Sequence, residues 1–204
     1  MDAGLLSLLG FAVAMSITPG PNNVMLASSG ANHGIRASVP HMLGISAGFA
    51  VMLVVISVGL GSLLQDWPSL QIIMRWVGAA WMLWLAWKIA SAPAPAPAPA
   101  PGTVAPRGVL GFTGAAAFQW INPKAWLIAL GAASEFTLPD LPLGWQALRT
   151  GFVFLVVALP CTLVWVLLGR GAAHLLHEPG RLRAFNVTMA ILLVVSLVPV
   201  LTGK

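Results

Sequence analysis

Charged residues are scarce in this 204-residue chain, which contains ten Lys and Arg and five Asp and Glu, or 7% of the sequence. An ordinary soluble domain carries roughly 25% charged residues. Hydrophobic residues make up 58% of the chain, so there are too few charged side chains to cover the surface of a water-soluble globule. The composition therefore predicts an integral membrane protein with the lipid bilayer as its main solvent.

Cysteine is nearly absent as well, since Cys161 is the only one. A single cysteine excludes an internal disulfide and a cysteine-based metal cluster. The net charge is +5, but the basic residues are spread along the chain and form no patch of the kind that binds nucleic acid. We therefore expect no metal, no cofactor and no nucleic-acid partner.

Long stretches without charge divide the chain into membrane spans. A helix rises 1.5 Å per residue and needs about 20 apolar residues to cross the hydrocarbon core. Runs such as residues 51–61 do not alternate polar and apolar residues as barrel strands do, so we expect an all-α integral membrane protein. We predict six transmembrane helices, at about residues 4–28, 37–62, 69–90, 108–134, 146–170 and 182–202.

An alternating Ala-Pro tract separates these spans into two sets of three. Proline-rich sequence favours extended polyproline II structure, so residues 91–107 are expected to form a cytoplasmic linker. It would join a first three-helix repeat at residues 1–90 to a second at residues 108–204. Because each set has an odd number of spans, the second enters the membrane from the opposite side, which predicts two inverted repeats.

Basic residues indicate the orientation in the membrane, since cytoplasmic loops carry an excess of Lys and Arg. An N-terminus outside the cell places six of the ten basic residues on the cytoplasmic side. These six are Arg36, Lys88, Arg107, Arg170, Arg181 and Arg183. We predict that both termini lie outside.

Prolines interrupt the first span of each half at a similar depth. Thr-Pro-Gly-Pro-Asn-Asn stands at residues 18–23 and Asn-Pro-Lys at residues 122–124; Pro19 and Pro123 each lie 15 residues after a glycine near the start of the span. Proline lacks an N–H group and frees carbonyls inside the membrane. Paired broken helices in corresponding positions indicate the binding site of a secondary transporter, whereas a plain kink is the structural alternative.

Lys124 lies near the middle of its span, where a lysine costs about 2.5 to 3.5 kcal/mol on insertion scales. No Asp or Glu lies deep within any predicted span, so its partners would be freed carbonyls, water or the carboxylate of a substrate. Gln119 shares a helix face with Asn122, so the two residues either line one cavity or Gln119 only hydrogen-bonds a neighbouring helix. The candidate substrate-binding residues are Pro19, Gly20, Pro21, Asn22, Asn23, Gln119, Asn122, Pro123 and Lys124, and no residue is assigned a catalytic role.

The lack of buried acids also bears on the substrate, because a cationic side chain would call for a carboxylate in a medium of low dielectric constant. We expect a small neutral or polar amino acid. Its carboxylate would lie near Lys124, and its ammonium would lie near Asn22, Asn23 and the carbonyls of the broken helices.

The two proline motifs, together with Gly-Ile-Ser-Ala-Gly-Phe at residues 44–49 and Gly-Ala-Ala-Trp at 78–81, resemble the LysE/RhtB superfamily of bacterial amino-acid exporters. Pro-Asn-Asn at 21–23, Ser-Ser at 28–29 and His-Gly at 33–34 are most similar to the cysteine/O-acetylserine exporter branch. The resemblance implies a six-helix inner-membrane efflux protein coupled to the proton gradient, with cysteine/O-acetylserine or homoserine/threonine-like substrates. Many relatives carry Asp where this chain has Asn22.

Two other classes of function are open to the sequence. A channel-like or structural helix bundle would not need matched broken helices. An intramembrane hydrolase would need a serine, a histidine base and an oxyanion donor on facing helices, and no Gly-x-Ser-x-Gly adjoins a span, so we expect no enzyme. Gly44 and Gly48 permit close helix approach, either within the chain or in a homodimer.

Overall fold

The computed structural model describes residues 3–60, 67–91, 110–136, 141–175, 179–195 and 197–198, and every element within them is a helix. The all-α prediction is confirmed for this part of the chain. Residues 92–107 of the predicted linker lie outside the described residues. The elements are α1 (Ala3–Ile17), α2 (Pro21–Val55), the π-helical turn η1 (Ile56–Leu60), α4 (Pro68–Ala90), α5 (Phe112–Phe118), the 3₁₀ turn η2 (Gln119–Ile121), α6 (Pro123–Glu135), α7 (Leu143–Leu175) and α8 (Pro179–Val195).

The N-terminal helical region is interrupted at two points, between α1 and α2 and within α2. The axis bends by 57° between α1 and the first segment of α2, Pro21–Ala31. Gly34 then divides α2, because its φ of 78° lies in the left-handed region that glycine adopts without a steric penalty. The first predicted span thus corresponds to α1 with Pro21–Ala31, and the second corresponds to the remainder of α2.

By length and composition, two of the described helices can cross a membrane, His33–Gly59 and Leu143–Ala172. The bent pair of α1 and Pro21–Ala31 makes a third if it counts as one span. A 3₁₀ turn followed by Pro123 divides the fourth predicted span into α5, η2 and α6, each too short to cross alone. The arrangement of six spans therefore stays a prediction.

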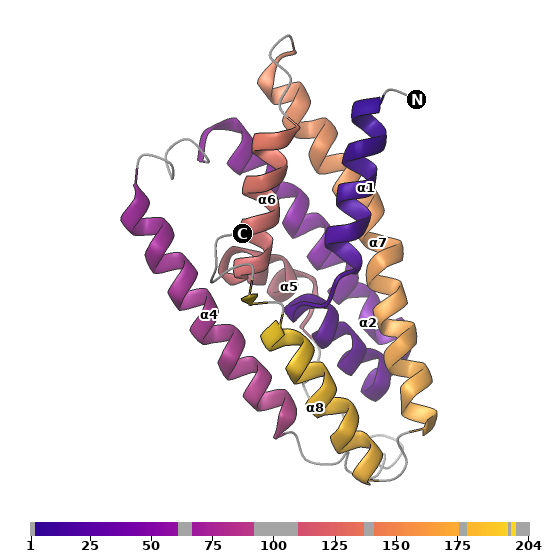
Figure 1. Ribbon diagram of the computed structural model, residues 1–204. Coiled ribbons are helices and arrows are strands. Elements are labelled where there is room, and N and C mark those ends of the chain that lie inside the picture. Colours follow the sequence, from indigo (N-terminus) through magenta and orange to yellow (C-terminus); the bar gives the residue numbers. More distant parts are fainter. Residues whose placement is uncertain are drawn as a thin grey trace.

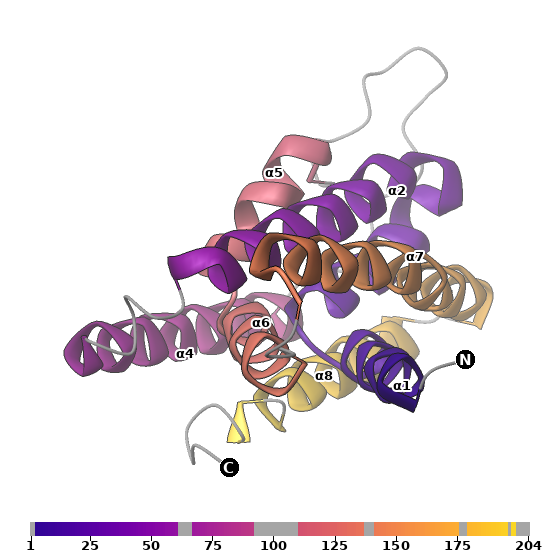
Figure 2. The same ribbon diagram turned by 90° about the horizontal axis from the view of Figure 1, so that it is seen from above.

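The long helices α2 and α7 pack along each other at the centre of the bundle (Figures 1 and 2). Helix α1 packs on α7, α5 packs on α2, and α4 packs on α8. Figure 2 shows α5 on the opposite side of α2 and α7 from α4, α6 and α8. The buried core between α1, α2, α6 and α7 includes Leu8, Phe49, Met52, Ile128 and Phe154.

Small residues set the spacing between the central helices. A Cβ atom on Gly30 would overlap the carbonyl oxygen of Val166, and one on Gly169 would overlap that of Ala27. Gly44 and Gly48 are buried and face Phe112 and Ala116 of α5 in the same manner. The Gly-x-x-x-Gly pair therefore makes a contact within the chain, which is the first of the two uses that the sequence left open.

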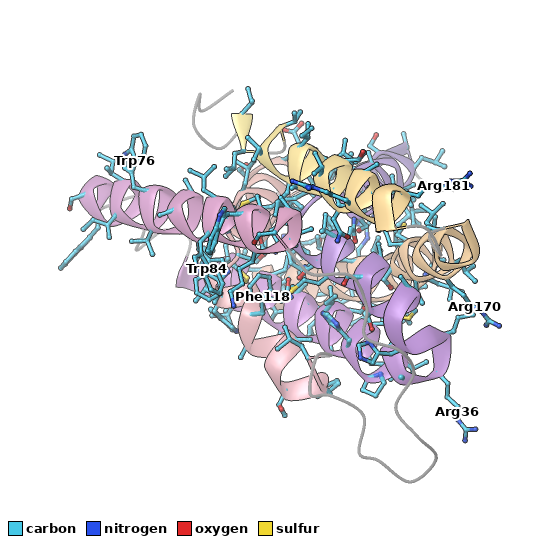
Figure 3. All side chains as sticks on the ribbon, turned by 90° about the horizontal axis from the view of Figure 1, so that it is seen from below. Arg36, Trp76, Trp84, Phe118, Arg170 and Arg181 are labelled. Carbon is cyan, nitrogen blue, oxygen red and sulfur yellow. The ribbon has the colours of Figure 1, made fainter. Side chains whose placement is uncertain are left out.

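Charged and apolar side chains are segregated on the outside of the bundle. The end of α7 and the start of α8 lie at the lower end of the bundle in Figure 1. In the view from below, Arg36, Arg170 and Arg181 project outward (Figure 3). Large apolar side chains elsewhere are exposed, for example Val77 and Phe152, each at 65%. Exposed apolar faces of this kind are the surface that a helical membrane protein presents to lipid.

Gly169 lies in the close contact between α2 and α7, whereas the nearby Gly171 has open space around it, so the same substitution should change stability in opposite directions. We expect Gly169→Ala to lower the free energy of unfolding by about 1 to 3 kcal/mol, because the methyl group overpacks the contact with Ala27. Gly171→Ala should instead raise it by about 0.5 to 1 kcal/mol, since no atom lies within 4 Å of an added Cβ and alanine favours a helix. Unfolding in detergent measures both variants, and equal effects would contradict the packing described.

Candidate functional site

The first helix break, at residues 18–20, leaves a row of carbonyls without helical partners. Pro19 and Pro21 provide no N–H group, and Gly20 has extended backbone with φ of 179°. Side chains supply the missing donors. Asn23 Nδ2 donates to the carbonyl oxygens of Ser16 and Thr18, each at 2.8 Å. Trp165 Nε1 of α7 donates to that of Ile17 at 3.0 Å.

The second helix break, at residues 119–122, is stabilised locally. Asn122 is the N-cap of α6, and its Oδ1 accepts a hydrogen bond from the backbone N–H of Lys124 at 3.1 Å. Asparagine is among the preferred N-cap residues, and Pro123 occupies the first helical position, where its missing N–H costs nothing. The Asn-Pro-Lys sequence is thus a helix start inside the bundle.

The helices that begin after the two breaks, α2 and α6, start in a similar way. Gly20 and Asn122 are the N-caps, and Pro21 and Pro123 are the first helical residues. Asn22 and Lys124 follow as the second helical residues. Pro19 and Pro123 match in their depth along the span, whereas Pro21 and Pro123 match in their place at a helix start, because Pro19 lies in the non-helical link.

A pair of amide side chains joins the two breaks. Asn22 Nδ2 donates to Gln119 Oε1 at 2.8 Å, and Gln119 Nε2 donates to Asn22 Oδ1 at 3.2 Å. Gln119 Nε2 also donates to the carbonyl oxygen of Ala115 at 2.9 Å. Because Gln119 is fully buried, this arrangement satisfies its amide without water.

Lys124, which follows the second break, bonds back to the first break. Its Nζ donates to the carbonyl oxygen of Thr18 at 2.8 Å, to Thr18 Oγ1 at 2.8 Å and to the carbonyl oxygen of Pro19 at 2.9 Å. The three donors of the ammonium are therefore all used. Of the partners that the sequence left open, freed carbonyls are the ones that bind Lys124 in this structure.

Two glycines make room for these contacts. A Cβ atom on Gly20 would lie 2.7 Å from Lys124 Cδ and 3.1 Å from its Nζ. A Cβ atom on Gly78 of α4 would lie 2.7 Å from the Cβ of Pro123. Gly20 is one of the candidate residues predicted from the sequence, whereas Gly78 stands out there only through the family resemblance.

A cavity of about 60 Å³ lies between the breaks and the central helices. Water needs about 10 to 15 Å³ on this measure, so the cavity has room for a few molecules. Seven of the nine candidate residues line it: Gly20, Pro21, Asn22, Asn23, Gln119, Asn122 and Lys124. Pro19 contributes its carbonyl to Lys124 instead, and Pro123 contacts Gly78.

The opposite wall of the cavity is apolar and was not anticipated. It consists mainly of Ile45, Phe49, Ile128, Phe154 and Ala158. These residues belong to continuous apolar runs of the sequence, where nothing distinguishes a cavity-lining side chain from a lipid-facing one. Thr162 lines the same wall, and its hydroxyl donates to the carbonyl oxygen of Leu159 at 2.9 Å.

The site combines a cation and two helix N-termini with neutral oxygen acceptors. The N-termini of α2 and α6 both lie at the cavity and carry a partial positive charge. Such a set suits a carboxylate, while amide and carbonyl oxygens suit an ammonium. No Asp or Glu lines this cavity within the described residues.

The fold and the site define a helical membrane protein of the transporter class, in which two broken helices meet at a polar cavity. The chain belongs to the LysE type translocator family, whose family model matches residues 13–202. The cysteine/O-acetylserine efflux proteins of Salmonella typhi and Escherichia coli K12 are 32% and 30% identical to it over 185 residues, covering 90% of each chain. No solved structure matches the sequence.

The amide pair across the breaks predicts an energetic coupling between Asn22 and Gln119. Asn22→Leu and Gln119→Leu should each lower the free energy of unfolding by about 1 to 3 kcal/mol, because each leaves a partner amide unsatisfied. The double variant should lose less than the sum, by roughly 0.6 to 1.7 kcal/mol. A double-mutant cycle between Asn22 and Thr188, whose hydroxyl donates to Ala184 within α8, is the control and should be additive. Strict additivity between Asn22 and Gln119 as well would contradict the pair.

Proposed function

We propose that this protein is a secondary transporter that exports small neutral or polar amino acids across the bacterial inner membrane. The observation that carries the proposal is the cavity at the two helix breaks, where a cation and neutral oxygen acceptors face an apolar wall. Relatives named cysteine/O-acetylserine efflux proteins favour substrates of that type. Homoserine and threonine are also small, neutral and polar and belong to the same proposal.

In this mechanism Lys124 binds the carboxylate of the amino acid. Its present partners are two carbonyl oxygens and one hydroxyl. The present bonds already have an ionised donor. A carboxylate adds the attraction of an opposite charge in a medium of low dielectric constant, so it competes with these neutral oxygens for the ammonium. The cavity is small, and the first break must move away from Lys124 as the substrate enters.

The ammonium of the substrate binds the oxygens around Asn22 and Asn23. Oδ1 of Asn22 and the carbonyls released from Lys124 are neutral acceptors that suit one cationic group. A second cationic group, as in lysine, would have no carboxylate partner in the cavity. The apolar side chains of Phe49 and Phe154 leave a short, weakly polar substrate side chain as the best fit.

The contacts also support two inverted three-helix repeats. The second helical residue of each break reaches the other break, Asn22 to Gln119 and Lys124 to Thr18. The helix pairs match in the same way, since α1 packs on α7 as α5 packs on α2. Movement of one repeat against the other around this site would provide alternating access.

The orientation follows from the end of the bundle that carries Arg36, Arg170 and Arg181. The positive-inside rule assigns this end to the cytoplasm, with both termini outside. Coupling to the proton gradient is part of the proposal on the strength of the family resemblance. Because Asn22 replaces the Asp of many relatives and no acid lines the cavity, the coupling proton would bind elsewhere.

The proposal is tested by efflux of labelled cysteine, O-acetylserine, homoserine, threonine and lysine from vesicles. We expect saturable export of the neutral amino acids that stops when the proton gradient is dissipated. Lys124→Ala should reduce it roughly tenfold or more, because a lost charge-assisted bond is worth about 1.5 to 3 kcal/mol. Lys88→Ala removes an exposed lysine that lies over Trp84 and should leave export unchanged.

Two results would overturn this account. Export of lysine without any neutral amino acid would contradict the substrate class. Wild-type kinetics in Lys124→Ala, with normal amounts of folded protein, would remove this residue from the binding site.

A further inference from the structure

A second polar cavity, of about 210 Å³, lies at the other end of the bundle from the three arginines. The start of α1, the end of α6 and the first turns of α7 enclose it (Figure 1). Its polar lining comes from Ser7, Glu135, Gln146, Arg149 and Thr150. In the proposed orientation this cavity opens on the outside of the cell.

The lining carries one acid and one base from different helices. Glu135 ends α6 and is exposed, whereas Arg149 lies in α7 and is half-buried. Within the described residues, these two side chains face one cavity without forming an ion pair with each other. Gln146, Arg149 and Thr150 lie three and four residues apart, so they occupy one face of α7.

A row of phenylalanine side chains connects the lining of this cavity to the lining of the central one. Phe49 and Phe154 line the central cavity, and Phe136 lines the outer one. Ring contacts connect them in series: Phe49 to Phe154 at 5.1 Å, Phe154 to Phe11 at 6.2 Å, and Phe11 to Phe136 at 5.5 Å between centroids. The row connects residues of the two cavities, so a direct route from the central cavity to the outer one leads past these rings to Glu135 and Arg149.

We propose that the outer cavity is a second, exit-side binding site for a zwitterionic amino acid, with its carboxylate on Arg149 and its ammonium on Glu135. The inference rests on the proposed export function. Two opposite charges held apart on one cavity match a ligand that carries both, because each end of the ligand gains a charge-assisted hydrogen bond. The buried side chains of Gln146 and Thr150 line the same cavity.

The test is inhibition of export from the outside. Right-side-out vesicles loaded with labelled O-acetyl-L-serine are placed in unlabelled O-acetyl-L-serine, in its N-acetyl derivative, which keeps only the carboxylate, or in its amide, which keeps only the ammonium. The external zwitterion should slow export, and the two derivatives should act only at concentrations at least tenfold higher.

Variants connect the inhibition to the site. Arg149→Gln and Glu135→Gln should each raise the external concentration for half-inhibition at least tenfold, while Arg149→Lys should raise it less. Arg170→Gln, on the same helix at the other end of the bundle, should behave as the wild type. Glu135→Gln changes an exposed side chain and keeps the test valid if Arg149→Gln fails to fold.

The outcomes separate the two proposals. If the wild type exports O-acetyl-L-serine but Glu135→Gln and Arg149→Gln retain wild-type inhibition, the exit-side site is wrong and the proposed function stands. If the external zwitterion does not slow export by the wild type, the exit-side site is likewise wrong and the proposed function stands. If the wild type exports none of the neutral amino acids, the proposed function itself fails, and the exit-side site fails with it.

Discussion

The structure depends on one constraint: backbone carbonyls released inside a membrane must find donors within the protein, because the hydrocarbon provides none. The two prolines of the first break release a row of them. Each carbonyl oxygen from Ser16 to Pro19 accepts a side-chain hydrogen bond, and the donors are Asn23, Trp165 and Lys124. Asn23 comes from α2 directly after the break, Trp165 comes from α7, and Lys124 comes from α6 at the other break. The break is therefore stable only within the assembled bundle.

The same constraint explains how Lys124 is tolerated. A lysine at this depth costs free energy unless its donors are satisfied, and the first break provides three acceptors for it. The carbonyls need a donor and the ammonium needs acceptors, so each offsets the cost of the other. In the proposed mechanism a substrate carboxylate replaces these acceptors. The bonds that stabilise the empty site are then the ones that must change during transport.

The central and outer cavities fit one route through the protein. Both present groups that suit a zwitterion, and a row of phenylalanines in ring contact connects the lining of one to the lining of the other. In the proposed cycle, substrate reaches Lys124 from the arginine-bearing end, and movement of one repeat against the other opens the aromatic row. An apolar barrier suits this purpose because it does not bind the polar solute that passes it.

Much of the site could be predicted from the sequence, because polar residues and prolines are conspicuous in apolar spans. Asn22, Gln119 and Lys124 were placed together on this basis, and the structure brings them to one cavity. Their pairing could not be predicted, since it depends on how two distant breaks face each other. Equal spacing in the sequence pairs Pro19 with Pro123, and only the structure shows that Pro21 begins its helix as Pro123 does. Apolar lining residues such as Phe154 give no signal in a sequence where most residues are apolar.

The central claim is tested most directly by measuring the contact between the Lys124 ammonium and the carbonyls of Thr18 and Pro19. Solid-state NMR of protein labelled with ¹⁵N at Lys124 Nζ and ¹³C at these carbonyls reports it in lipid. Without substrate, we predict close contacts that correspond to the hydrogen bonds at 2.8 and 2.9 Å. With a saturating exported amino acid, these contacts should weaken, and a contact between Nζ and the substrate carboxylate should appear. Unchanged carbonyl contacts and no contact with the bound carboxylate would contradict the account.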